Sequence, residues 1–84
     1  MVVNWTRFDP EEFDFEFNEE KLEVHGISVN EAAEVLWNGF RPLQDKDYND
    51  RYLLLGRTDG GRPLELVAVV LGKRKLRIIT GWRL

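Results

Sequence analysis

Apolar and polar side chains alternate early in the chain, where Phe13, Phe15 and Phe17 are separated by Asp14 and Glu16. A period of two predicts a β-strand with the three rings on one face and the two carboxylates on the other. Because aromatic side chains mainly contribute buried area, we expect the rings to pack in the hydrophobic core. The preceding residues 1–12 show no such period, so they are predicted to form an N-terminal arm that frays or pairs with a sheet edge.

The spacing of apolar residues changes to three and four in the next segment, which predicts helix. Asn18 is expected to cap a short helical turn that Gly26 closes, because glycine tolerates the left-handed backbone that often follows a helix. Ser28 and Glu31 have the spacing of a capping box, so the main helix should run from there to about Asn38. Its expected apolar face comprises Val29, Ala32, Ala33, Leu36 and Trp37.

Strand patterns dominate the second half of the chain. Residues 41–50 are polar and rich in turn formers, so they are predicted to be a loop. Residues 51–58 and 62–71 are predicted to be antiparallel strands joined by a hairpin turn at Asp59-Gly60-Gly61. After a tight turn at 72–74, residues 75–82 alternate again and are expected to form a third strand of the same meander.

These elements predict an α+β fold class: a small antiparallel sheet of three to four strands (a meander) with one main amphipathic helix packed on it. The 84 residues suffice for one hydrophobic core, and 43% of them are hydrophobic. We therefore expect a single domain over residues 13–84, preceded by the arm of residues 1–12.

Composition narrows the classes of function. The chain has no cysteine, which excludes disulfides, thiolate metal sites and thiol nucleophiles, and suits the cytoplasm. Its longest apolar run, residues 66–71, is far shorter than the roughly 20 residues that cross a bilayer, so no membrane association is expected. We predict a cytoplasmic protein.

The net charge of −3 conceals a division along the chain. Residues 1–49 contain twelve acids and four bases, a sum of −8, whereas residues 50–84 contain three acids and eight bases, a sum of +5. The overall acidity argues against nonspecific binding of nucleic acid, but a basic face in the second half could receive a polyanion.

Metal and cofactor motifs are not found. The chain has a single histidine, and the acidic loop around Asp45 and Asp47 lacks the glycine and closing glutamate of a calcium loop. Gly60 and Gly61 lie inside a hairpin and not between a strand and a helix, so they do not form a phosphate-binding loop. We predict neither a metal nor a cofactor.

The remaining candidate chemistry is carried by His25 and the arginines of the sheet. Cleavage of RNA through its own 2′-hydroxyl needs a base, an acid and cations at the phosphate, and it needs no metal. Arg51 and Arg57 are six residues apart on one strand, as are Arg77 and Arg83, so each pair is expected on one face. Alternatively, these arginines are ordinary surface charges that protect sheet edges and keep the domain soluble.

Four segments follow one another in an order that resembles a known family. They are residues 15–21 (FEFNEEK), 25–35 (HGISVNEAAEV), 51–62 (RYLLLGRTDGGR) and 77–80 (RIIT). Together they resemble the BrnT-type toxins of bacterial type II toxin–antitoxin systems, which share a RelE-like ribonuclease architecture. The resemblance spans most of the chain.

The resemblance implies a RelE-like fold and a toxin that is a metal-independent endoribonuclease acting on RNA. It also implies a cognate antitoxin protein that blocks the site, and contact with operator DNA only through the antitoxin complex. On this basis the predicted catalytic residues are His25, Arg57 and Arg77, and the predicted RNA-phosphate-binding residues are Arg51, Arg62 and Arg83.

Two positions depart from the family pattern. Val24 stands where the family has a lysine before the histidine, and Trp82 stands where it has an arginine. Three possibilities therefore remain open: an active toxin, a weakened one, or a noncatalytic protein-binding module that keeps the RelE-like fold.

Overall fold

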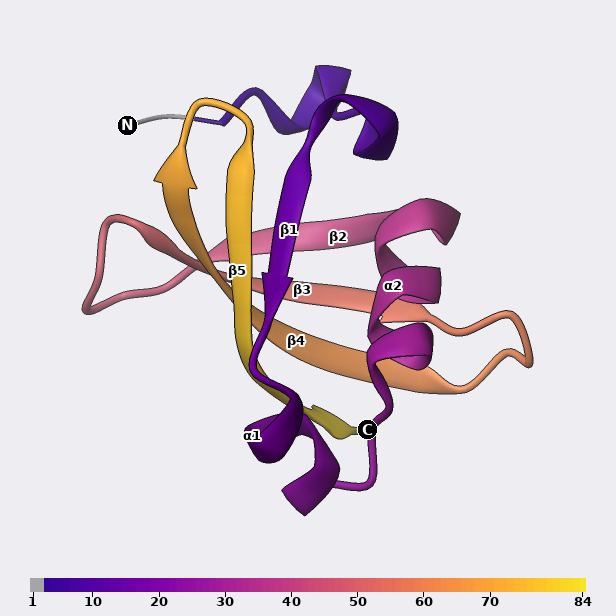
Figure 1. Cartoon of the computed structure of the whole chain (residues 1–84). Coiled ribbons are helices and arrows are strands. Elements are labelled where there is room, and N and C mark those ends of the chain that lie inside the picture. Colours follow the sequence, from indigo (N-terminus) through magenta and orange to yellow (C-terminus); the bar gives the residue numbers. More distant parts are fainter. Residues whose placement is uncertain (1–2) are drawn as a thin grey trace.

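A five-stranded mixed sheet packs against two short α-helices in the computed structural model, which describes residues 3–84 (Figure 1). The α+β class is confirmed, whereas the purely antiparallel sheet of three to four strands is wrong. The strand order is β1-β5-β4-β3-β2, with β1 parallel to β5 and every other pair antiparallel. The strands are β1 (Asp14–Phe17), β2 (Phe40–Gln44), β3 (Arg51–Arg57), β4 (Pro63–Gly72) and β5 (Lys75–Arg83); the helices are α1 (Glu19–Val24) and α2 (Val29–Asn38).

The additional strand is β2, which falls in the predicted loop of residues 41–50. Phe40, Pro42 and Gln44 alternate toward the core, and β2 pairs with β3 along its whole length. Proline lacks a backbone donor and is tolerated at a sheet edge, where its nitrogen faces away from the neighbouring strand. The strand therefore depends on pairing with β3, which a polar edge sequence does not reveal.

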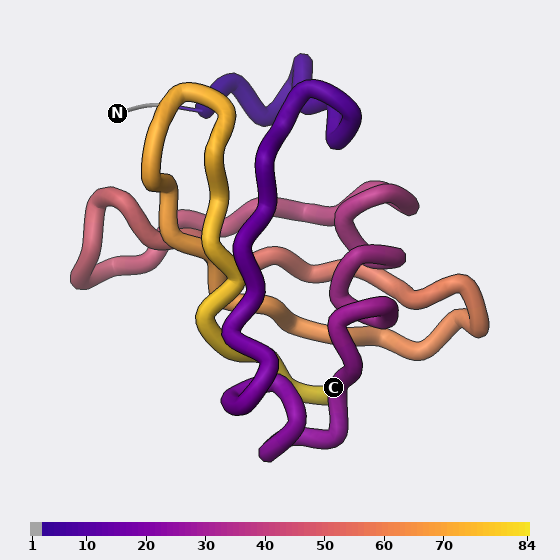
Figure 2. Tube along the Cα trace, viewed as in Figure 1, coloured from indigo at the N-terminus to yellow at the C-terminus, as the bar shows by residue number. Residues whose placement is uncertain are grey.

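The parallel pair follows from the path of the chain between β1 and the rest of the sheet. β1 leads into both helices before β2 begins, and β5 returns beside β1 at the end (Figure 2). Phe15 pairs with Leu76 and Phe17 with Ile78, so the rings of β1 join the core as expected.

Both predicted helix starts are confirmed by hydrogen bonds. The Asn18 side chain accepts from the backbone N–H of Lys21 at 3.2 Å, which caps α1. At α2, the Ser28 hydroxyl accepts from the N–H of Glu31, and the Glu31 carboxylate accepts from the N–H of Ser28, forming a complete capping box. Gly26 follows α1 with a φ of 72°, a conformation that favours glycine.

The N-terminal arm forms two single-turn 3₁₀ helices, Trp5–Arg7 and Pro10–Glu12, and not an edge strand. Its first two residues lie outside the described residues. Val3 is buried in the core, and the ring of Trp5 contacts Phe40 and Tyr52 with centroid distances of 5.6 and 5.0 Å. The arm thus closes one end of the core with aromatic contacts.

A β-bulge in β5 changes the faces of its last residues. Ala68 pairs with Ile78 and Val67 with Thr80, which leaves Ile79 as the extra residue. Residues after the bulge point to the face opposite to the one that simple alternation predicts. Gly81 consequently faces the helices, where a Cβ atom would lie 2.7 Å from Leu66 Cδ2.

Candidate functional site

Helices cover one face of the sheet, and no element of residues 3–84 covers the other, which we call the open face. The helices and the arm pack against the side that carries Leu54, Leu66 and Ile78 (Figure 1). The other side is formed by alternate residues of all five strands. Its members are Asp14 and Glu16 of β1, Arg41 and Leu43 of β2, Arg51, Leu53, Leu55 and Arg57 of β3, Pro63, Glu65, Val67 and Val69 of β4, and Lys75, Arg77, Thr80 and Trp82 of β5. Leu71, the unpaired residue at a second bulge in β4, follows them and is 45% exposed.

Six aliphatic side chains form a continuous strip across the open face. Leu43, Leu53 and Val67 are direct cross-strand neighbours, so they make one row over three strands. The apolar strip consists of Leu43, Leu53, Leu55, Val67, Val69 and Leu71. Leu43 and Leu71 are 37% and 45% exposed, Leu53, Leu55 and Val69 are half-buried, and Val67 is 6% exposed. No helix or arm within residues 3–84 lies over the strip.

Two apolar runs in the sequence indicate this strip, although a strict alternation of apolar and polar residues does not. β3 and β4 contain the apolar runs 52–55 and 66–71 instead of strictly alternating. Continuous apolar strands are typical of sheets covered on both faces. Within residues 3–84, helices and the arm cover only one of these two faces.

Charged residues surround the apolar strip with an excess of cations. The open face carries five cations and three carboxylates, a net charge of +2. The rest of the chain carries seven bases and twelve acids, a net charge of −5. The charge division along the sequence corresponds to this division only in part, because four bases of the second half, Arg62, Lys73, Arg74 and Arg83, are not members of the open face.

Three cations of the open face, Arg41, Arg51 and Arg57, have no carboxylate partner in the described part of the chain. Arg41 pairs in register with Leu55, and Arg51 pairs with Val69. The guanidinium carbon of Arg51 lies 4.1 Å from the centre of the Tyr48 ring, a cation–π contact that leaves its charge uncompensated. Arg57, at the end of β3, donates from Nη1 to the carbonyl oxygen of Gly61 at 2.8 Å.

On the β1 side of the open face, the cations are paired. Lys75 Nζ lies 2.9 Å from one carboxylate oxygen of Glu16, and Arg77 Nε lies 3.7 Å from the other. The hydrogen bond from Lys75, followed by its charge, lowers the pKa of Glu16, and the same bond raises the pKa of Lys75. Arg77 of this cluster lies in one row with Val69 and Arg51, because both arginines pair with Val69.

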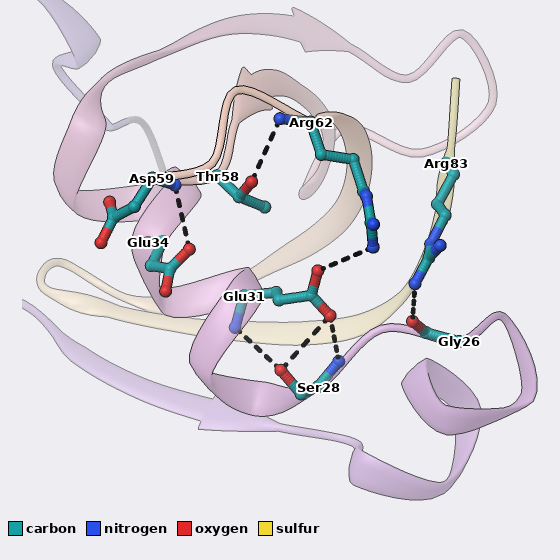
Figure 3. Close-up of polar contacts among 8 residues, drawn as sticks. All are labelled: Gly26, Ser28, Glu31, Glu34, Thr58, Asp59, Arg62 and Arg83. Carbon is teal, nitrogen blue, oxygen red and sulfur yellow. Dashed lines mark hydrogen bonds and ion pairs between the residues drawn. The ribbon is translucent and has the colours of Figure 1, made fainter.

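Two of the predicted phosphate-binding arginines, Arg62 and Arg83, make contacts with α2 and with the turn between the helices, away from the open face; Figure 3 shows these contacts. Arg62 pairs with Glu31 at 3.3 Å and joins the β3–β4 turn to α2. Arg83 donates to the carbonyl oxygen of Gly26 at 2.7 Å and holds the turn between the helices. The expectation that Arg77 and Arg83 share a face is wrong, because the bulge at Ile79 turns Arg83 toward the helix side.

The three predicted catalytic residues lie far apart. Arg57 pairs with Pro63 and Arg77 with Val69, six residues further along β4, which corresponds to about 20 Å. His25 follows α1 at the other end of β5 from Arg77, with its ring 6.3 Å from that of Trp82. Proton transfer needs groups within hydrogen-bond reach of one substrate, and these three residues do not converge on a point.

Other features give no competing site within residues 3–84. A polar hollow of about 340 Å³ lies between the arm and the β4–β5 turn, but its charges are mixed and Arg74 is paired with Glu12 at 3.1 Å. No group of three histidine, aspartate or glutamate side chains in this part of the chain could hold a metal ion. No helix there is long and apolar enough to cross a membrane.

The row of Arg51, Val69 and Arg77 is where the predicted arginines come closest to acting together. Arg51 and Arg77 both neighbour Val69, so their Cα atoms are two strand spacings, or about 10 Å, apart. The open face thus combines an aliphatic centre with cations around it.

Comparison of the chain with protein-family models, with curated proteins and with solved structures gives no match.

Proposed function

We propose that this protein is a noncatalytic binding module with a toxin-like sequence pattern, and that its open face holds a protein partner. The apolar strip is the observation that carries the proposal, because nothing within residues 3–84 covers it. Neighbouring apolar side chains that a small protein leaves at least partly exposed are typical of an interaction site, and five of the six strip residues are exposed or half-buried. In the toxin-like interpretation the partner is the cognate antitoxin, and operator DNA is reached only through that complex.

The chemistry of the strip favours protein over RNA as the principal ligand. Single-stranded RNA is held by aromatic side chains that stack on bases and by cations along the backbone. The centre of the open face is aliphatic: Trp82 lies at one end beside His25, and the Tyr48 ring lies against Arg51 outside the strip. Leucine and valine side chains instead match the apolar core of a protein interface.

A photo-crosslinking side chain at position 43 tests the proposal, with the same side chain at position 24 as a matched control. Leu43 lies on the strip, whereas Val24 is 80% exposed on α1. We expect one dominant crosslinked protein from position 43 and none from position 24. After purification, this partner should bind Leu43→Asp about tenfold more weakly than the wild type and should bind Val24→Asp normally. Equal crosslinking from both positions would contradict the proposal.

A metal-independent endoribonuclease is the second candidate function. The net charge of +2 on the open face, together with His25 near one end of it, favours this alternative. Purified protein would then cleave a mixed single-stranded RNA in the presence of a chelator, and His25→Gln would abolish the cleavage. RNA that stays intact under these conditions, together with unimpaired growth of expressing cells, rejects the enzymatic function.

A further inference from the structure

We infer that the partner presents an acidic amphipathic α-helix to the open face. The inference rests on the proposed function and specifies the chemistry of the partner. Such a helix would place apolar side chains on the strip and carboxylates beside the arginines that border it. Three features of the open face lead to this occupant: the shape of the strip, the placement of its unpaired cations, and the charge of the remaining surface.

The shape of the strip suits a helix that crosses the strands diagonally. Leu55 lies opposite Glu65, and Val69 is four residues further along β4, so the paired part of the strip is about 13 Å long. The unpaired Leu71 at the second bulge extends it to about 20 Å. A helix of about 13 residues has this length, and its diameter of about 10 Å spans two to three strands. Apolar residues at positions i, i+4, i+7 and i+11 would follow the strip.

The cations are placed so that a helix on the strip would meet charge on both sides. Arg41 and Arg51 lie on the β2 and β3 side, and Arg77 lies on the β5 side. The first two have no ion pair within residues 3–84, so their charge is available to a ligand. Glu65 is the single carboxylate within the strip region, where it neighbours Leu55. Flanking glutamates or aspartates on the helix complement this arrangement.

The charge of the remaining surface also favours an acidic helix as the ligand of the open face. Outside the open face the chain carries a net charge of −5, which on balance disfavours the approach of an acidic segment there. Electrostatic steering would therefore bring an acidic helix to the open face. A basic helix would be attracted to the opposite surface, which carries the glutamates of α1 and α2.

A second copy of this chain fits the open face less well. Two open faces in contact would bring together two surfaces of charge +2. An open face against the acidic helix side of another copy is a head-to-tail contact that does not close and would lead to fibres. A separate acidic helix has neither problem.

Designed peptides of about 14 residues test the inference by fluorescence anisotropy. The first carries leucines at i, i+4, i+7 and i+11 with glutamates beside them; the second has lysines in place of the glutamates; the third is a scrambled version of the first. We expect the first peptide alone to bind, to gain helical circular dichroism on binding, and to weaken as salt rises. Arg41→Glu should weaken its binding about tenfold, whereas the control Arg7→Glu, on the arm, should not.

Each other outcome overturns the inference. Equal binding of the lysine peptide would show that charge does not determine binding. Equal binding of the scrambled peptide would show that an apolar helical face is not required. A protein that dimerises through Leu43, as shown by light scattering of the wild type and of Leu43→Asp, has a second copy as its occupant. If the crosslinked partner depends on Leu43 and the acidic peptide does not bind, the inference fails while the proposed function stands.

Discussion

Replacing Gly81 with alanine should destabilise the protein, because the bulge in β5 turns this position into the core. A Cβ atom there would lie 2.7 Å from Leu66 Cδ2, 2.8 Å from the carbonyl oxygen of Glu65 and 3.4 Å from Ile27 Cδ1. The backbone oxygen cannot move without disturbing the β4–β5 ladder, so the chain must shift. Overpacking of this kind costs about 1–3 kcal/mol, offset by roughly 0.4–1 kcal/mol from the stiffer unfolded chain.

We therefore expect Gly81→Ala to lower the free energy of unfolding by about 1–2 kcal/mol and Tm by about 5–15 °C. Urea unfolding and thermal unfolding, both followed by circular dichroism, measure these quantities. Gly60→Ala is the matched control, because its Cβ atom would meet only Thr58 Oγ1 at 3.9 Å, and its stability should equal or exceed that of the wild type. Equal stability of the two variants would refute the bulge and with it the assignment of faces after Ile79.

Three further predictions concern the helices and the ion cluster. Ser28→Ala removes the capping box of α2 and should cost about 1 kcal/mol in urea unfolding. Leu22→Ala, at a fully buried position of α1, should cost about 2–5 kcal/mol in the same measurement. The lowered pKa of Glu16 gives stability that is present above its ordinary value of 4.5 and is lost as pH falls through the folded-state pKa. Stability measured from pH 3 to pH 7 should therefore fall less steeply at the acid end in Glu16→Gln than in the wild type; an unchanged slope would contradict this.

Features with a local cause were predictable from the sequence. The Asn18 cap, the capping box at Ser28 and the left-handed Gly26 each depend on residues within a few positions of one another. The hairpin between β3 and β4 also has a local signal, since turn-forming glycines separate two apolar runs. These features set the helix boundaries and the antiparallel centre of the sheet.

Features that depend on distant partners were not predictable. β2 is a strand because β3 supplies its hydrogen bonds, and its own sequence, with Pro42 in the middle, resembles a loop. The bulge at Ile79 has no sequence mark of its own, yet it determines which way Arg83 points. The parallel position of β1 beside β5 likewise depends on the path of the chain through both helices.

The same distinction applies to the candidate site, where strand spacing predicts which residues share a face but does not predict the partners of their side chains. Even spacing correctly puts Arg51 and Arg57 on one face, because β3 is regular. Spacing does not show that Arg57 would donate to Gly61, or that Arg62 would pair with Glu31. Arg57 therefore has a local acceptor, and Arg62 lies away from the open face, so the apolar strip contributes more to the candidate site than the arginines do.

Methyl NMR of the protein with its crosslinked partner tests the central claim most directly. The account predicts that the methyl signals of Leu53, Leu55 and Val67 shift on binding, since these residues form the middle of the apolar strip. The signals of Val24, which is exposed on α1, should stay unchanged. Shifts concentrated at Val24, with the methyl groups of the strip unaffected, would show that the partner binds the helix side and would contradict the account.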